Sequence, residues 1–376
     1  MTDSTKISSS SLNRIPAEIL CAQDYETLAQ RFIDPTHYAY ISGGSGKDLT
    51  LDANRIAFAR RSICPRLLRD VSKGSTALTL AGQPLPHPIL LAPVAYQTLA
   101  HPLGELETAR AAAALQSVMI SSTLASNTLE DIAQQAGPQR WFQLYLQPQR
   151  KITLDLLRRA EAAGYTAIVL TLDASIQIPS QRALRAQFCM PQHCVAANLT
   201  GYEPAPTDTL SHNESRIFQG VMRHAPTQND IEWLLTQTHL PVWFKGVLHP
   251  EDACLLQSLG AQGLVVSNHG GRTLDGAPAS LTMLPAIRQA VGCDYPLLFD
   301  GGIRSGADIF KAIALGADAI LIGRLQLYAL SVAGALGVAH MIRTLHEELE
   351  ATMALAGCAT LHDIRATKLL RADDIS

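Results

Sequence analysis

Between residues 87 and 324, short apolar runs alternate with segments whose apolar residues recur at helical spacing. Each run is bounded by Gly, Pro or Asn, and its apolarity is continuous, which is typical of parallel strands buried on both faces. There are eight such runs: 87–95, 117–123, 140–146, 167–173, 241–247, 263–270, 295–302 and 319–324. Eight strands alternating with helices favour an α/β fold, the (β/α)8 TIM barrel, with a doubly wound open sheet as the alternative.

Two segments of the chain differ from the ordinary strand–helix alternation. The crossover after the fourth strand, about 174–228, is very long and rich in Pro, Ser, Thr and Asn. Because it leaves the carboxyl end of its strand, we expect a long loop or lid over the face where barrels place their active sites. Residues 329–356 are predicted to form one long amphipathic helix, the last of the ring. The barrel is expected over about 87–357.

The amino-terminal part precedes the barrel. Residues 1–15 are rich in Ser and Thr without the apolar stretch of a secretory signal, so we expect a disordered tail. From about 16 to 80 we expect an N-terminal helical cap, with helices over 22–32 and 49–60. Residues 16–376 are interpreted as a single domain.

Charge and cysteine content argue against several partners. The 376 residues carry 30 Lys and Arg against 33 Asp and Glu, a formal net charge of -3, so the basic footprint of a nucleic-acid-binding protein is lacking. No run approaches the roughly 20 apolar residues of a membrane span. The seven cysteines form no Cys-x-x-Cys pair and no zinc-like spacing with His. We expect no nucleic acid, membrane or metal partner, reduced thiols and a cytoplasmic location.

Polar residues follow most of the eight runs directly. Barrels carry their catalytic groups where the strands end at the carboxyl face. Six of the eight ends hold polar or charged side chains, which favours a catalytic barrel over a structural one. The ends are Pro93-Val94-Ala95-Tyr96, Ser122-Thr123, Gln143-Leu144-Tyr145, Thr171-Leu172-Asp173, Lys245-Gly246, 267–272, 300–304 and Gly323-Arg324.

The last two strand ends are typical of a phosphate site. Asp300 and two glycines precede Arg304, and Gly323 precedes Arg324. Glycines let backbone N–H groups approach phosphate oxygens, and arginines add charge-assisted donors, at the place where barrels commonly bind phosphate. The alternative is two tight turns with surface arginines.

The sixth run ends in a histidine followed by glycines, which leave room for a substrate to approach it. His269 is followed by two glycines, and Arg272 offers a planar fork for a carboxylate. Asp173 and Lys245 end other strands at the same mouth. A lone histidine is more often a core residue, and a lone lysine is often a rim residue. A phosphate site, a lysine and a His/Arg pair together suggest a phosphorylated redox cofactor that faces a small acid.

With these motifs the chain resembles the FMN-dependent L-2-hydroxy-acid oxidase/dehydrogenase family, which includes glycolate oxidase, lactate oxidase and mandelate dehydrogenase. The resemblance covers about 25–357 and is closest in look to the hydroxymandelate oxidases, through Thr123-Leu124 and the Gly-rich 42–46. The motifs are Ser-Asn-His-Gly-Gly-Arg at 267–272, Leu-Asp-Gly at 274–276, Asp-Gly-Gly-Ile-Arg at 300–304, Gln-Leu-Tyr at 143–145, Lys-Gly-Val at 245–247 and His-Pro-Leu-Gly-Glu at 101–105.

The resemblance implies a role for each matching residue. His269 would be the base and Asp173 would hold its ring. Arg272 would bind the substrate carboxylate and Tyr145 the substrate oxygen, while Lys245 would sit at flavin N1/O2. The remaining residues implied to bind FMN are Pro93, Ala95, Ser122, Gln143, Thr171 and Ser267 at the ring or ribityl chain, Asp300 at the ribityl hydroxyls, and Gly302, Arg304, Gly323 and Arg324 at the phosphate.

Three positions depart from the family pattern. A tyrosine that usually contacts the substrate is expected at Ala39, and an aromatic residue common in the family is replaced by Leu124. A second substrate-binding arginine is replaced by Ser180, with Arg182 and Arg185 nearby. These changes predict a pocket enlarged for an aryl or otherwise bulky acid.

We therefore expect FMN-dependent oxidation of an L-2-hydroxy acid to the 2-oxo acid, with electrons passed to O2, by a homotetramer. Three alternatives stay open. One is a dehydrogenase that uses quinone or another carrier. Another is a different FMN barrel, such as a type 2 isopentenyl-diphosphate isomerase. The third is a catalytically silent flavin-binding protein.

Overall fold

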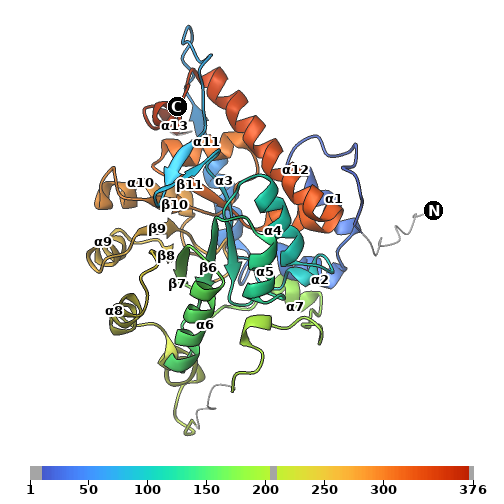
Figure 1. Ribbon diagram of the computed structural model, residues 1–376, viewed down its shortest axis with the longest axis vertical. Helices are drawn as coiled ribbons and strands as arrows, with labels where there is room; N and C mark the ends of the chain where they lie inside the picture. The colour runs from blue at the N-terminus through green and yellow to red at the C-terminus, as the bar shows by residue number, and fades with distance from the viewer. Residues whose placement is uncertain (1–10, 204–209, 372–376) are drawn as a thin grey trace, which may run out of the picture.

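The computed structural model describes residues 11–203 and 210–371. At its centre, eight parallel strands close into a barrel in the spatial order β10-β11-β4-β5-β6-β7-β8-β9 (Figure 1). Each of the eight predicted runs contains one strand, so the predicted (β/α)8 barrel is confirmed and the open sheet is excluded. The strands are β4 (Ile89–Leu91), β5 (Met119–Ser122), β6 (Arg140–Leu144), β7 (Ala167–Thr171), β8 (Val242–Val247), β9 (Gly263–Val266), β10 (Leu297–Phe299) and β11 (Ala319–Ile322).

Helices cover the outside of the barrel. They are α4 (Glu105–Ala114), α5 (Leu129–Gln135), α6 (Arg150–Ala162), α8 (Gln228–Gln237), α9 (Pro250–Ser258), α10 (Ser280–Val291), α11 (Gly306–Ala314) and α12 (Arg324–Ala356). Side-chain caps start two of these helices: the hydroxyls of Thr128 and Ser305 accept from the backbone N–H three residues on, at the start of α5 and α11.

The last helix of the ring is longer than predicted, and a short helix, α13 (Leu361–Arg365), follows it. α12 begins at Arg324 rather than near 329, and non-helical dihedral angles at Ala333 and Gly334 break it. By length and composition α12 is apolar enough to cross a membrane, but 78% of its most apolar stretch is buried inside the protein. Its apolarity is therefore that of a core helix.

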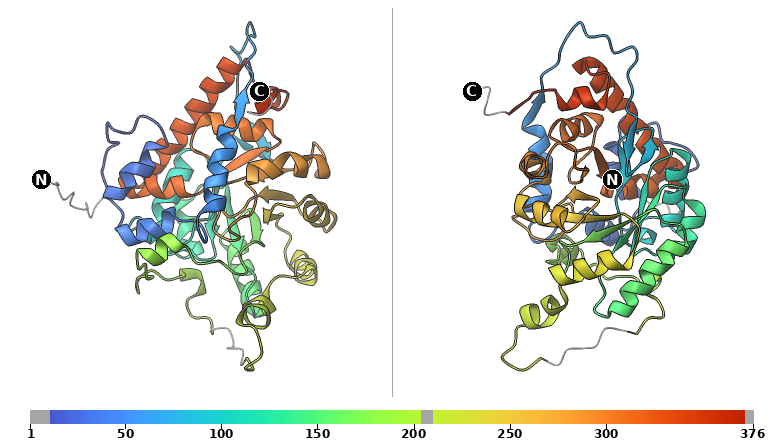
Figure 2. Two further views of the ribbon diagram at one scale, coloured as in Figure 1. Left: turned by 180° about the vertical axis from the view of Figure 1, so that it is seen from behind. Right: turned by 60° about the vertical axis from the view of Figure 1, so that its left-hand side comes forward.

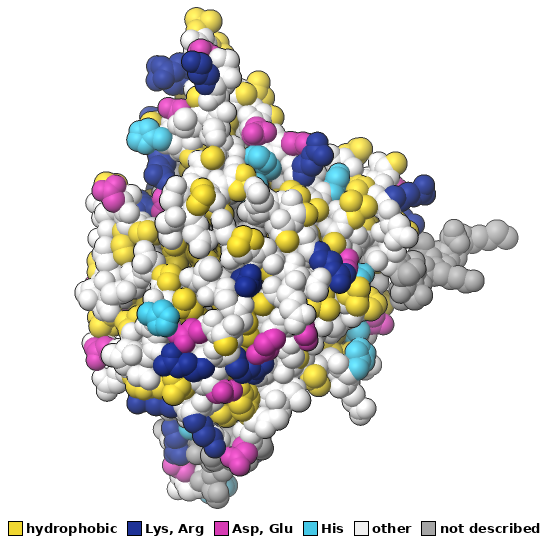
Figure 3. Space-filling view, viewed as in Figure 1, with side chains coloured by type: hydrophobic (Ala, Val, Ile, Leu, Met, Phe, Trp, Pro, Cys, Tyr) yellow, Lys and Arg dark blue, Asp and Glu magenta, His cyan; other side chains and the backbone are white. Residues whose placement is uncertain are grey.

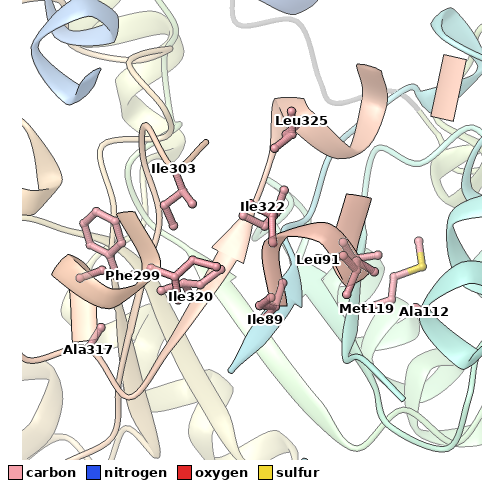
Figure 4. Close-up of a cluster of buried hydrophobic side chains, with 14 of the residues drawn as sticks. Ile89, Leu91, Ala112, Met119, Phe299, Ile303, Ala317, Ile320, Ile322 and Leu325 are labelled. Carbon is pink, nitrogen blue, oxygen red and sulfur yellow. The ribbon is translucent and has the colours of Figure 1, made fainter. Parts of the chain in front are cut away.

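Successive residues of each strand enter two different cores. Ile89 and Leu91 of β4 pack between the barrel and its helices, together with Met119 and Ile320 (Figure 4), whereas Leu90 points into the barrel. The barrel interior also holds two stacked tryptophans, Trp141 and Trp243, whose ring centroids are 5.0 Å apart. Burial on both faces explains why the strands have continuous apolar runs.

A hairpin closes the amino-terminal end of the barrel. It consists of β2 (Leu78–Leu80) and β3 (Gln83–Leu85). Leu80 and Leu85 belong to the same apolar cluster as the barrel interior. The bottom of the barrel is thereby covered, and the opposite end, where the strands finish, remains for the functional groups.

The amino-terminal cap contains one helix more than predicted. α1 (Asp24–Leu28) and α3 (Leu49–Ala59) fall within the expected ranges, but α2 (Pro35–Ser42) lies between them. Asp34 accepts from two backbone N–H groups at the start of α2 and Pro35 follows it, a recognised start signal. Residues 1–10 of the expected tail lie outside the described residues, and the described Leu12 donates its backbone N–H to Val332 O at 2.7 Å.

The long crossover after β7 extends beyond the ring of helices (Figures 1 and 2). It contains α7 (Gln181–Arg185), three short turns of 3-10 or π type (Ala197–Leu199, Arg216–Gly220 and Val221–His224), and finally the ring helix α8. α7 packs beside α2, which brings the crossover against the amino-terminal cap. Residues 204–209 of the crossover lie outside the described residues.

Charged side chains of both signs are interspersed on the surface shown in Figure 3. The described part of this face has no broad area of one sign.

Candidate functional site

One cavity opens at the carboxyl end of the barrel strands. Its wall includes residues that follow seven of the eight strands and two residues of the amino-terminal helix α2, Tyr40 and Ile41. Among the predicted site residues, those that line it are Pro93, Ala95, Ser122, Tyr145, Lys245, His269, Arg272, Asp300, Gly302, Arg304, Gly323 and Arg324. The other predicted residues, Gln143, Thr171, Asp173 and Ser267, lie directly behind this wall through contacts given below.

His269 and Asp173 form the central pair of the site. His269 Nδ1 lies 2.9 Å from Asp173 Oδ1, and both side chains are largely buried, with 18% and 13% exposed. His269 itself has a left-handed backbone, with φ of +57°, and so have the next two glycines. This conformation is rare for a non-glycine residue and is often found at functional sites. The tight turn it forms directs the imidazole into the cavity.

The charge of Asp173 fixes which histidine nitrogen is available. Burial alone would raise the pKa of Asp173, but the neighbouring His269 and Lys245 outweigh it and the pKa lies below its usual value. An ionised carboxylate accepts a hydrogen bond from Nδ1–H, which leaves Nε2 of a neutral imidazole free to act as a base. The pair is therefore arranged for proton abstraction.

Lys245 is the centre of a second buried network. Its side chain is 4% exposed, and Nζ donates to Ser267 Oγ at 3.0 Å and lies 3.4 Å from Asp300 Oδ2. Ser267 Oγ in turn donates to Asp300 Oδ1 at 2.6 Å. Burial would lower the pKa of Lys245, but Asp300 and Asp173 raise it above its usual value. A permanent positive charge therefore borders the cavity.

Arg272 borders the cavity beside His269. Its Nη1 donates to Tyr40 O at 2.9 Å and to Gly43 O at 3.2 Å, and its guanidinium carbon lies 4.7 Å from the centre of the Tyr40 ring. Tyr145 lines the same part, and burial raises its pKa above the usual value. A protonated phenol and a guanidinium are donors that suit the hydroxyl and carboxylate of an acid.

Tyr40 is the site residue that the sequence reasoning missed. It lines the cavity, whereas Ala39 is a buried residue of α2 and is not part of the wall. Ala39 therefore does not itself border the cavity, and Tyr40, about 100° further around the helix, does. The start signal at Asp34 and Pro35 predicts a helix over this stretch, on which Tyr40 and Ala39 face different directions.

The other two departures from the family pattern are Leu124 and Ser180. Leu124 lines the cavity. Ser180 caps α7, its hydroxyl accepting from Ala183 N. Arg182 does not replace the missing arginine, because its Nε and Nη2 donate to Asp48 Oδ2 at 3.1 and 2.7 Å. Arg185 donates to Gln181 on its own helix.

The predicted phosphate end has both arginines, each held by the protein. Arg324 donates to the carbonyls of Ile41, Gly43 and Gly270 at 2.7–2.9 Å. Arg304 Nε donates to Glu26 Oε2 at 2.9 Å. Burial lowers the pKa of Arg324 to about 10, so it stays charged at neutral pH.

The backbone that precedes each of these arginines suits an anion. Gly302 has φ of +88°, and a Cβ there would lie 2.7 Å from Asn54 O, so only glycine fits. α12 begins at Arg324, next to Gly323, and a helix amino terminus attracts negative charge. Two guanidiniums, a glycine turn and a helix start together match a phosphate group.

Unpartnered polar atoms fit the ring of a flavin. Gln143 Nε2 and Thr171 Oγ1 are buried without a hydrogen-bond partner in the described chain. Gln143 Oε1 accepts from Ser122 Oγ, which lines the cavity, and Thr171 pairs in register with Lys245. Buried polar groups are rarely left unsatisfied, so these atoms indicate a ligand with a hydrogen-bonding edge. The residues present thus fit FMN: Gln143, Thr171 and Lys245 would hold its ring, and Arg304 and Arg324 would hold its phosphate.

Residues 29–371 match the family of FMN-dependent dehydrogenases. An L-lactate oxidase of Alicycliphilus denitrificans is 65% identical over 353 residues, which cover 94% of this chain and 96% of the relative. Glycolate oxidase 1 of Zea mays is 38% identical, with 95% and 97% covered. The crystal structure of a mandelate oxidase with (S)-2-phenylpropionate is 40% identical with a TM-score of 0.85, and covers 94% of this chain and 98% of that one. The chain therefore belongs to the FMN-dependent dehydrogenase family and is an FMN-dependent enzyme of 2-hydroxy-acid oxidation.

Proposed function

We propose that the enzyme is an oxidase, which converts an L-2-hydroxy acid and O2 into the 2-oxo acid and hydrogen peroxide. The observation that carries the proposal is the His269–Asp173 pair at 2.9 Å, beside Arg272 in the same cavity. The relatives at 65% and 38% identity are both oxidases, which supports O2 as the acceptor. When bound, FMN takes up the two electrons of the substrate C–H bond and delivers them to O2.

The chain supplies binding and proton transfer. Nε2 of His269 takes the proton lost by the substrate, and Asp173 stabilises the imidazolium that forms. Arg272 binds the carboxylate, and the protonated Tyr145 donates to the substrate oxygen. Lys245, which stays charged, would stabilise negative charge on the ring of the FMN that the site holds.

For the side chain of the acid, we propose a short aliphatic group of lactate size. Tyr40, not a small residue, stands in the wall beside Arg272. Its ring is backed by Phe188, with 4.4 Å between ring centroids, so this side of the cavity is filled. The 65% identity to an L-lactate oxidase points the same way.

An aryl or bulky acid is the second candidate. It is favoured by Leu124, which lines the cavity where many relatives have a larger aromatic side chain. The mandelate oxidase structures, at 40% identity, show that the overall fold is compatible with such substrates. The two candidates differ in one measurable quantity, the ratio of kcat/KM for lactate and mandelate.

The test uses the purified yellow enzyme with a panel of glycolate, L-lactate, L-phenyllactate and L-mandelate. Flavin bleaching without O2 reports oxidation of each acid, and hydrogen peroxide formation in air reports the acceptor. We expect both signals, with L-lactate giving the highest kcat/KM. Bleaching without peroxide, and reoxidation only by a quinone or dye, would identify a dehydrogenase. No bleaching with any acid would overturn the proposed reaction.

A further inference from the structure

We propose that Phe188, in the crossover between β7 and β8, is a positioning residue for the carboxylate-binding Arg272, and that it acts through Tyr40. The inference rests on the proposed function, because it assigns the substrate carboxylate to Arg272. Phe188 lies outside the cavity wall, so the inference adds a more distant residue to those that determine substrate affinity. It also assigns the crossover a role in substrate binding.

Three side chains from distant parts of the chain form one stack. The rings of Tyr40 and Phe188 are 4.4 Å apart between centroids and inclined by 17°. The guanidinium carbon of Arg272 lies 4.7 Å from the centre of the Tyr40 ring. Each group is in van der Waals contact with the Tyr40 ring, and we infer that they lie on its opposite faces, with Tyr40 between Arg272 and Phe188. Both contacts are of kinds that attract beyond simple burial.

Arg272 depends on residue 40 for much of its orientation. Its Nη1 donates to the backbone oxygens of Tyr40 and Gly43. Among the described residues, Arg272 has no carboxylate partner, and its Nε and Nη2 donate to no protein acceptor. These donors remain available for the substrate carboxylate. The direction in which they point is set by the carbonyl contacts and by the Tyr40 ring.

Phe188 is held rigidly by the end of α7. Its backbone N–H donates to Ala183 O at 3.0 Å, and the N–H of Gln187 donates to Leu184 O at 3.0 Å. Gln187 has a left-handed backbone with φ of +55°. This is the pattern of a Schellman motif, which fixes the residues that follow a helix. Because α7 packs on α2, the motif places Phe188 against the Tyr40 ring.

The position of Arg272 matters more in this chain than it would if a second arginine also bound the carboxylate. Ser180 occupies the place where the family pattern has another arginine, and Arg182 is bound to Asp48. The carboxylate of the acid thus meets a single guanidinium beside His269. A small loss of order in that guanidinium should appear directly as weaker binding of the acid.

The experiment measures acid binding separately from turnover. In Phe188→Ala, the KM of the best acid and the Kd of oxalate, followed by the flavin absorbance, should each rise roughly five- to tenfold, while kcat changes less than about twofold. Phe188→Tyr, which keeps the stacked ring, should restore both values. Phe218→Ala is the matched control, because Phe218 is 73% exposed in the same crossover.

A double-mutant cycle tests the route of the effect. In an Arg272→Lys background, Phe188→Ala should change the oxalate Kd much less, because the guanidinium on which it acts is gone. Unchanged KM and Kd in Phe188→Ala, or an equal loss in the Arg272→Lys background, would overturn the inference. These outcomes differ from failure of the proposed function. In that case, none of the 2-hydroxy acids would bleach the flavin of the unmodified enzyme.

Discussion

Nδ1 of His269 lies 2.9 Å from Oδ1 of Asp173, although the two residues are 96 positions apart in the chain. Each stands just beyond the end of its own barrel strand, β9 and β7, and the closed barrel brings the two ends together. The second carboxylate oxygen, Oδ2, has no partner among the described residues. The contact with the imidazole is therefore the main interaction that orients the Asp173 carboxylate.

Replacing the histidine tests the base directly. His269→Gln should retain FMN, since it leaves the phosphate end intact, but it should reduce the rate of flavin bleaching by about 10²–10⁴-fold. The measurement is anaerobic stopped-flow reduction by the best acid, with FMN content read from the absorbance of the purified variant. Bleaching at the unmodified rate would show that another group is the base.

A glycine beside His269 and Asp173 allows a test in which neither of these two residues is mutated. A Cβ on Gly246 would lie 2.5 Å from Cβ and Cγ of Asp173, whereas a Cβ on Gly260 would meet nothing within 4 Å. Their φ angles are similar, +101° and +97°, so alanine strains the backbone alike at both. We expect Gly246→Ala to lower kcat at least about tenfold through a displaced carboxylate, with Gly260→Ala near the unmodified rate. Comparable kcat values in the two variants would contradict a role for the Asp173 position.

The sequence predicted the barrel and its mouth because both follow from local patterns. Strands buried on two faces need continuous apolar runs, and the residue after each run must lie at the carboxyl end, so His269, Lys245 and Arg324 could be placed without coordinates. Tyr40 could not be placed while α2 went unrecognised, since an offset of one residue on a helix exchanges a cavity residue for a buried one.

Other features of the site depend on tertiary contacts alone. Arg182 is removed from the cavity by Asp48, more than a hundred residues earlier in the chain. Nothing in the local sequence of either residue indicates that ion pair. The contact of Arg304 with Glu26 of α1 is of the same kind. Such pairs join segments whose relative placement only the folded chain defines.

Stability should depend on pH through a histidine at the opposite end of the barrel. Burial, and next the nearby His346, lower the pKa of His87 from 6.5 to about 4. In this range the unfolded chain binds a proton that the folded chain does not, so stability is fully present above about pH 6.5 and is lost as the pH falls toward 4. The shift corresponds to about 3 kcal/mol in the free energy of unfolding.

Urea unfolding at pH 7.5 and 4.5, with saturating FMN, should show this loss in the unmodified protein. His87→Gln, in which residue 87 cannot titrate, should lose less free energy of unfolding between pH 7.5 and 4.5. His212→Gln, at an exposed histidine, should behave like the unmodified protein. Equal losses in all three would mean that His87 is protonated in the folded state as readily as in the unfolded one.

Leu124 should control which acids the enzyme accepts. It lines the cavity, and its backbone is fixed on both sides, with its N–H donating to Ser122 Oγ and its oxygen accepting from Tyr96 N. In Leu124→Trp the larger side chain must therefore project into the cavity rather than move aside. It should lower kcat/KM for mandelate at least about tenfold more than for lactate, or roughly 1.4 kcal/mol of discrimination.

Leu255→Trp serves as the control, because Leu255 lies on α9 and is 43% exposed. FMN content should match in both variants, so that any change in kcat/KM reports the substrate pocket. If the unmodified enzyme already prefers mandelate to lactate, the bulky-acid candidate gains support and Leu124→Trp should reverse the preference. If Leu124→Trp lowers kcat/KM equally for both acids, Leu124 does not discriminate by size, because one side chain has then impaired a step that the two substrates share.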